Sequence, residues 1–163
     1  MNFILDTTYV LPLFGVTVDL SPESTQEIKE IWQVKFSQFE LYLPSVCLIE
    51  VAYKLNAEFR QHCDGKILER LPLVLPTVLD NPCVKLFHPQ ANILATEMAM
   101  KVRASGHTDL MDCWIAGSAT ALDGILLTEE SELKRQLKNI PEFSEIAIWN
   151  WKRFQKELSR FSG

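Results

Sequence analysis

The segment of residues 106–132 constrains the fold most strongly, because it specifies a helix, a stop and a buried strand in immediate succession. Thr108 is a good N-cap for the helix, since its hydroxyl can accept a hydrogen bond from an amide of the first turn. Asp123 and Gly124 form a stop, because Gly tolerates the left-handed conformation in which many helices end. Residues 125–128 (Ile-Leu-Leu-Thr) follow at once. So short an apolar run predicts a buried strand.

Short apolar runs alternate with helical segments along the rest of the chain. Further strands are predicted at residues 2–5, 40–43, 84–87 and 145–149. Helices are predicted at residues 21–38, 46–61, 89–105, 131–138 and 151–161. This alternation implies a parallel sheet with helices on both faces. We therefore expect an α/β fold with three layers, α/β/α, a mostly parallel central sheet of about five strands, and a single domain over residues 1–163.

Prolines make two further segments less regular. Residues 9–14 are expected to form a helix that is interrupted near Pro12. Residues 66–80 have a helical pattern that contains Pro72 and Pro76. Because an interior proline removes a hydrogen bond of the helix, we expect two short helices with a bend between them.

The composition is that of an ordinary globular protein, with 47% hydrophobic and 23% charged residues. The net charge of −5 gives no general basic field that would attract nucleic acid or an anionic membrane. No apolar run approaches the roughly 20 residues that cross a bilayer. The N-terminus lacks the basic region of a signal peptide. The four cysteines form no Cys-x-x-Cys pair, so a reducing cytoplasm is the expected compartment.

Four acidic residues are placed where they could meet at one edge of the predicted sheet. Asp6 follows the first strand, Glu50 lies in the helix after the second, and Glu130 follows the fourth. In open parallel sheets, ligands bind beyond these carboxyl ends. Asp112 lies near the start of the helix before the fourth strand. It joins the others if the preceding connection returns to the same edge.

Each acid also has an ordinary structural explanation. Asp6 can be an N-cap, Asp109 can interact with the helix dipole, and Glu50 can pair with Lys54 one turn later. A converging cluster explains Glu50 and Asp112 better, because both have mostly apolar neighbours. Such a cluster is unfavourable unless it is protonated or holds a cation. An all-oxygen set suits Mg²⁺ or Mn²⁺.

The order and spacing of these motifs resemble the PIN-domain ribonucleases, and among them the VapC-type toxins of bacterial toxin–antitoxin pairs. The residues that carry the resemblance are 3–7 (Phe-Ile-Leu-Asp-Thr), 44–45 leading into 49–52 (Ile-Glu-Val-Ala), 112–116 (Asp-Cys-Trp-Ile-Ala) and 123–128 with its following acid. The resemblance covers nearly the whole chain.

The resemblance implies metal-dependent hydrolysis of RNA phosphodiester bonds. The four acids of the family, which are both catalytic and metal-binding, fall on Asp6, Glu50, Asp112 and Glu130. The last is a departure, because the family usually has Asp there, and Glu is one methylene longer. Supporting positions fall on Thr7, Thr128 and Asp109. Mg²⁺ or Mn²⁺ held by carboxylates can lower the pKa of a bound water and stabilise charge on the leaving oxygen.

The toxin resemblance also implies a short antitoxin protein as a partner, and we expect a homodimer and no membrane association. Trp32 and Phe36, on the predicted helix 21–38, are expected to be exposed contact residues. The basic residues just past Glu130 offer either phosphate contacts or a solvated helix face: Lys134, Arg135 and Lys138.

Two other functions are compatible with the pattern. One is a catalytically degenerate PIN-like domain that binds RNA or protein without cleavage, and a measurement of divalent-metal binding distinguishes it from the nuclease. The other is a phosphoacceptor receiver domain, which needs an acidic pair after the first strand. Asp6 stands alone there, which disfavours the receiver.

Overall fold

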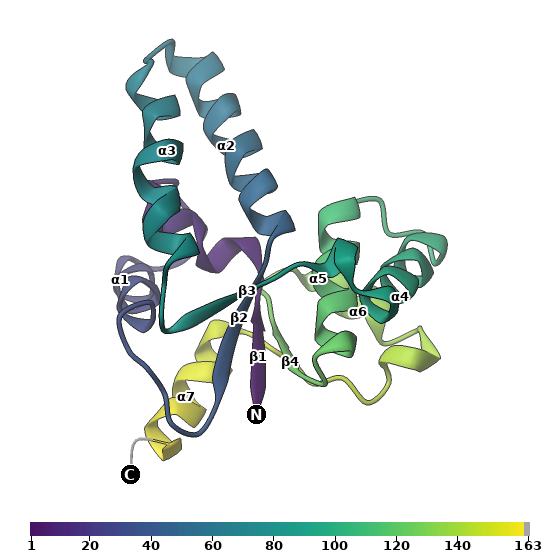
Figure 1. Cartoon of the computed structure of the whole chain (residues 1–163). Coiled ribbons are helices and arrows are strands. Elements are labelled where there is room, and N and C mark those ends of the chain that lie inside the picture. Colours follow the sequence, from purple (N-terminus) through teal and green to yellow (C-terminus); the bar gives the residue numbers. More distant parts are fainter. Residues whose placement is uncertain (162–163) are drawn as a thin grey trace.

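A five-stranded parallel sheet forms the centre of the protein (Figure 1). The structure, a computed structural model, describes residues 1–161 and the side chains up to residue 158. The strands are arranged in the order β3-β2-β1-β4-β5, and all four neighbouring pairs run parallel. Their bounds are β1 Asn2–Leu5, β2 Glu40–Pro44, β3 Val84–Phe87, β4 Ile125–Leu127 and β5 Ile148–Trp149. The expected α/β class and parallel sheet are confirmed.

Helices cover both faces of the sheet (Figure 1). One face carries α1 and α7, and the other carries α4, α5 and α6, while α2 and α3 form a hairpin beyond the carboxyl ends of the strands. The α-helices are α1 Pro22–Ile31, α2 Val46–His62, α3 Lys66–Leu79, α4 Ile93–Ala104, α5 Leu110–Ala121, α6 Ser131–Leu137 and α7 Trp151–Phe161. Short 3-10 turns are η1 Thr7–Tyr9, η2 Leu11–Phe14, η3 Pro89–Ala91 and η4 Pro141–Phe143. In the described residues, no helix has the length and apolar character that a bilayer crossing requires.

The central strand β1 is buried on both sides. Phe3, Ile4 and Leu5 have no exposed surface, as expected for a strand between two helical layers. The ring of Phe3 packs edge-on against Phe39 and Phe154, with centroid distances of 5.1 and 4.9 Å. Phe154 belongs to α7, so this aromatic cluster fixes the C-terminal helix to the centre of the sheet.

The helix α3 continues through both of its prolines, and the prediction of two short helices was wrong. Pro72 and Pro76 are four residues apart on the same side of the helix, and both are exposed. The carbonyl groups that lose their amide partners are those of Leu68 and Pro72. Because Leu68 is also exposed, water can take the place of a missing donor there.

The helix α1 is shorter than predicted, and the residue after it is buried. It ends at Ile31, and Trp32 is only 4% exposed. The indole nitrogen of Trp32 donates a hydrogen bond to the carbonyl of Tyr9 at 3.0 Å. Phe36 is half-buried and stacks on Phe39 at 4.3 Å. Trp32 is therefore part of the interior and Phe36 packs against it. Neither side chain is exposed, and their expected role as exposed contacts was wrong.

Large apolar side chains are exposed elsewhere, above all on the hairpin of α2 and α3. Leu73 is 78% exposed and Tyr53 is 65% exposed. A periodic pattern identifies the apolar face of a helix, but it does not tell which face of the hairpin the rest of the chain covers.

The packing of α4 against α5 depends on Gly117, which gives a stability prediction. A methyl group at this position would lie 2.3 Å from the backbone oxygen of Ala95, in α4. Gly117→Ala is therefore expected to destabilise the protein by about 1–3 kcal/mol, although Ala is the better helix former. The melting temperature should fall by roughly 2–12 °C, as measured by circular dichroism.

Gly65→Ala is the matched control for Gly117→Ala. Nothing lies within 4 Å of the added methyl group, and Gly65 has helical dihedral angles. We expect the control to melt at the wild-type temperature or above. An equally stable Gly117→Ala variant would show that α4 and α5 can separate without loss.

Candidate active site

The four predicted acids line one pocket at the carboxyl ends of the strands. Its volume is about 640 Å³. Seven of the lining residues that the structure describes are acidic: Asp6, Asp19, Glu50, Asp109, Asp112, Glu129 and Glu130. The only basic lining residue among them is Lys54. The pocket thus concentrates negative charge, and its electrostatics favour a cation.

Asp6 lies at the end of β1 and is held at both carboxylate oxygens. Its Oδ1 accepts a hydrogen bond from the amide of Thr7, and its Oδ2 accepts one from the hydroxyl of Thr128, each at 2.5 Å. Burial, together with the charges of Asp112 and Glu50, raises the pKa of Asp6 to about 7, against the opposing hydrogen bond from Thr128. The ionised form of Asp6 is therefore poorly compensated.

Glu50 enters the pocket from the first part of α2. Its Oε2 accepts a hydrogen bond from the hydroxyl of Thr7 at 2.5 Å. Thr7 thereby connects Glu50 to Asp6, because its amide binds one carboxylate and its hydroxyl binds the other. No ion pair joins Glu50 to Lys54 in the described part of the chain, so pairing with Lys54 does not explain this acid.

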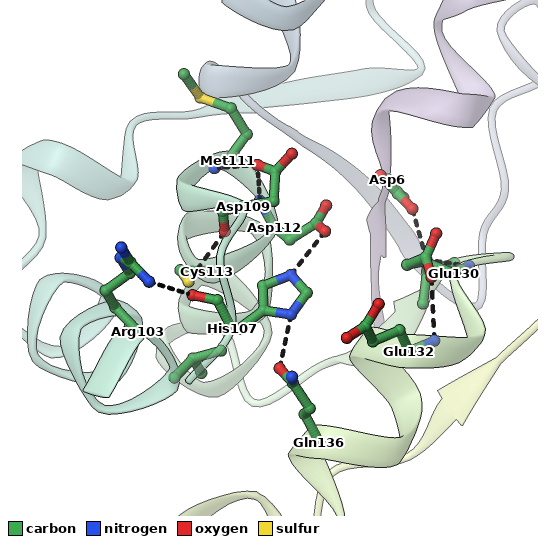
Figure 2. A network of polar contacts seen from close by, with 12 residues as sticks. Asp6, Arg103, His107, Asp109, Met111, Asp112, Cys113, Glu130, Glu132 and Gln136 are labelled. Atoms are coloured by element: carbon green, nitrogen blue, oxygen red, sulfur yellow. Dashed lines mark hydrogen bonds and ion pairs between the residues drawn. The ribbon is translucent and has the colours of Figure 1, made fainter. Parts of the chain in front are cut away.

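Asp112 is brought to the pocket by the first turn of α5, and a histidine holds it there (Figure 2). Its Oδ2 lies 2.8 Å from Nε2 of His107. Nδ1 of the same ring lies 2.6 Å from Oε1 of Gln136, in α6. Burial raises the pKa of Asp112 to about 6, against the opposing hydrogen bond with His107.

Asp109 is the N-cap of α5, and the prediction of Thr108 was wrong. The Oδ1 of Asp109 accepts hydrogen bonds from the amides of Met111 at 2.8 Å and Asp112 at 3.4 Å (Figure 2). These amides belong to the second and third helical positions, which an N-cap side chain normally reaches. Asp109 thus orients the turn that carries Asp112.

Two adjacent acids follow β4, and both take part in local structure. Glu130 is exposed and is the N-cap of α6, because its Oε1 accepts a hydrogen bond from the amide of Glu132 at 3.0 Å. The Oε1 of Glu129 accepts one from the hydroxyl of Tyr9 at 2.8 Å and another from the amide of Trp151 at 2.7 Å. Glu129 therefore joins η1 to the start of α7.

Sequence reasoning missed His107, Gln136 and Glu129. Glu129 stood beside a predicted acid, and its position after the strand was a usable signal. Gln136 gave no local signal, because its contact with His107 joins residues 29 positions apart. His107 is only five residues before Asp112, but no sequence pattern showed that its ring faces the carboxylate. Only the three-dimensional structure brings them together.

The donor chemistry of the pocket fits Mg²⁺ or Mn²⁺, which prefer carboxylate oxygens. The raised pKa values of Asp6 and Asp112 fit the same ions, because burial disfavours a charged carboxylate unless a cation compensates it. In residues 1–161, however, no three Asp, Glu, His or Cys side chains are grouped closely enough to hold a metal ion.

Comparisons with known proteins identify the fold. No protein-family model matches the chain, and a search of curated proteins found no match. Among solved structures, a chain of VapBC2 from Rickettsia felis bound to a DNA fragment from their promoter matches with a TM-score of 0.58 and 19% identity, over 93% of this chain and 99% of that one. VapBC-1 from nontypeable Haemophilus influenzae matches with a TM-score of 0.61 and 15% identity, over 93% and 99%.

FitAcB from Neisseria gonorrhoeae matches with a TM-score of 0.57 and 13% identity, over 91% of this chain and 97% of that one. The chain has the PIN-like fold of VapC-type toxins. The PIN-like fold spans nearly the full length of the matched chains, so the resemblance seen in the sequence is confirmed at the level of the fold. Asp6, Glu50, Asp112 and Glu130 line a single pocket of it, and their roles as ligands remain a prediction.

Proposed function

We propose that the protein is a metal-dependent endoribonuclease and the toxin of a toxin–antitoxin pair. The observation that carries the proposal is the convergence of Asp6, Glu50, Asp112 and Glu130, from four separate segments, on one pocket of a PIN-like fold. The burial that raises the pKa of Asp6 and Asp112 adds support, because it is unfavourable unless a cation or a proton compensates it.

The chain's own residues would act mainly by positioning. Asp6, Glu50 and Asp112, with Glu130 at the rim, would hold Mg²⁺ or Mn²⁺. The bound ion would supply a water of lowered pKa and stabilise charge on the leaving oxygen. Thr7 and Thr128 orient the carboxylates through three hydrogen bonds of 2.5 Å.

Lys54 gives the proposed substrate its counter-charge. As the basic residue among the described lining residues, it can contact a phosphate that enters the pocket beside Glu50. The basic residues at positions 134–138 are less suited, because none of them lines the pocket. We therefore assign substrate contact to Lys54 before the group at residues 134–138.

The partner we propose is a short antitoxin protein. The matched structures are described as VapBC and FitAB complexes, two of them with DNA, and this supports such a partner. The exposed apolar residues of α2 and α3, such as Tyr53 and Leu73, offer contact area for a partner. A homodimer is also part of the proposal.

A second candidate is a PIN-like domain that binds RNA or protein without cleaving it. Two observations favour it. The described carboxylates are not grouped as a ready metal site, and Glu130 is already used as a helix cap. In this case the pocket would retain its charge without a tightly bound cation.

The two functions are separated by an assay of purified protein on a pool of unstructured RNA. We expect cleavage in millimolar Mg²⁺ or Mn²⁺, complete loss in excess EDTA, and recovery when the metal is restored. DNA of the same sequence serves as the control substrate. RNA binding without cleavage in either metal would favour the binding module. Cleavage that continues in EDTA would contradict the metal-dependent mechanism.

A further inference from the structure

A buried histidine connects the pocket to the helix behind it. His107 is 4% exposed, and both of its ring nitrogens are engaged. Nε2 faces Oδ2 of Asp112 at 2.8 Å, and Nδ1 faces Oε1 of Gln136 at 2.6 Å (Figure 2). Gln136 belongs to α6, the helix that Glu130 caps. The ring therefore lies between two segments that each supply a predicted acid.

The backbone around His107 is also fixed. Its carbonyl oxygen accepts a hydrogen bond from Nη1 of Arg103 at 2.8 Å, and Arg103 belongs to α4. The preceding Gly106 has φ of +104°, a conformation that L side chains rarely adopt. This turn delivers the imidazole to the space between α5 and α6. The backbone of His107 is thus held in place, as are both nitrogens of its ring.

The chemistry of the two contacts explains why an imidazole suits this place. The amide oxygen of Gln136 can only accept, so Nδ1 donates to it. An imidazolium carries a proton on both nitrogens, so Nε2 can at the same time donate to the Asp112 carboxylate, on the opposite side of the same rigid ring. Because the ring is planar and buried, the Asp112 carboxylate has little freedom to turn away from the geometry that it sets.

We propose that His107 is a positioning residue of the nuclease site: it orients the Asp112 carboxylate and couples it, through Gln136, to the helix that begins after Glu130. The inference rests on the proposed function, since it concerns how one of the proposed metal ligands is held. The proposed role of His107 is geometric: a group that hydrogen-bonds to a metal-ligating carboxylate holds that carboxylate in the orientation that metal binding requires. A histidine that merely fills the core would leave the metal affinity unchanged when replaced.

The test compares variants by titration with Mn²⁺ alone, followed by electron paramagnetic resonance. His107→Leu should weaken Mn²⁺ binding by about 10–100-fold. His107→Gln should recover most of the affinity, because its amide NH₂ reaches the place of Nε2 and can donate to Asp112. His107→Asn reaches only the place of Nδ1 and should not recover it. His62→Leu, at the exposed end of α2, is the control and should bind as the wild type does.

RNA cleavage supplies a second readout. The turnover lost in His107→Leu at low Mn²⁺ should return at high Mn²⁺, while KM for RNA stays within about twofold, because the ligands themselves remain. Circular dichroism establishes that each variant is folded. If His107→Leu does not fold, the Gln and Asn variants decide the question.

The possible outcomes separate the two proposals. Equal Mn²⁺ affinity of folded His107→Leu and wild type would overturn the positioning role, and so would equal affinity of the Gln and Asn variants. In both cases the proposed function would stand. A wild-type protein that binds no Mn²⁺ would overturn both.

Discussion

Glu50→Gln is expected to abolish metal-dependent RNA cleavage while leaving the fold intact. The substitution removes a charge and keeps the shape, and the amide oxygen of Gln can still accept the hydrogen bond that Thr7 donates to Glu50 at 2.5 Å. The local structure should therefore survive. A neutral amide is a poor ligand for Mg²⁺, so we expect at least a 100-fold loss of cleavage rate.

The control for Glu50→Gln is the same substitution at Glu58, two turns further along α2. Glu58 pairs with Arg70 at 3.1 Å and does not line the pocket. Glu58→Gln should cleave RNA at the wild-type rate, as measured with a labelled oligoribonucleotide under single-turnover conditions. Full activity in a well-folded Glu50→Gln variant would remove Glu50 from the site and weaken the proposed nuclease function.

The architecture was predictable from the sequence because it follows from local patterns. Apolar runs of three to five residues, separated by amphipathic helices, leave a parallel sheet as the natural arrangement. The start of α1 is also local, since Ser21 accepts a hydrogen bond from the amide of Ser24. The predictions were wrong where tertiary contacts determine the local structure. Trp32 ends α1 because its indole binds Tyr9, a residue 23 positions earlier.

The candidate site was predictable to the extent that topology determines it. A parallel sheet brings the carboxyl ends of β1 and β4 to one edge, so Asp6 and Glu130 had to lie near each other. The chemistry between the acids was not predictable. Whether Asp6 meets Thr128 depends on the packing of residues 122 positions apart, and whether Asp112 meets His107 depends on how the turn before α5 directs the ring. The N-cap of α5 shows the same limit on a smaller scale, because Thr108 and Asp109 are both good caps and only the backbone path selects one.

Asp112→Asn is expected to stabilise the metal-free protein at pH 8 and to have no such effect at pH 4. The pKa of Asp112 is about 6 in the folded protein, raised by burial from 3.8. A raised pKa means that the folded state holds the proton more tightly than the unfolded state does. The wild type therefore loses stability as pH rises from about 4 to above 6. An Asn at this position does not ionise, so its contribution to the free energy of unfolding does not change over this range.

The size of the effect follows from the shift, which corresponds to about 3 kcal/mol. Loss of part of the contact with His107 opposes it, so we expect a net gain of about 1–2 kcal/mol at pH 8. For a chain of 163 residues this raises the melting temperature by roughly 2–8 °C. Asp64→Asn is the control. Asp64 lies outside the pocket and accepts a hydrogen bond from the amide of Lys66, which Asn can keep.

A second expectation concerns the effect of a bound metal ion on the melting temperature. A ligand that binds only the folded state stabilises it in proportion to the logarithm of its concentration over the dissociation constant. Millimolar Mn²⁺ should therefore raise the melting temperature of the wild type and of Asp64→Asn, and should do so much less for Asp112→Asn. Melting curves at pH 4 and pH 8 in EDTA, and at pH 8 in Mn²⁺, measure both effects. If Asp112 serves only the helix dipole, Asn would lower the midpoint in EDTA at pH 8, and Mn²⁺ would act alike on all three proteins. That result would contradict both the raised pKa of Asp112 and its proposed role as a metal ligand.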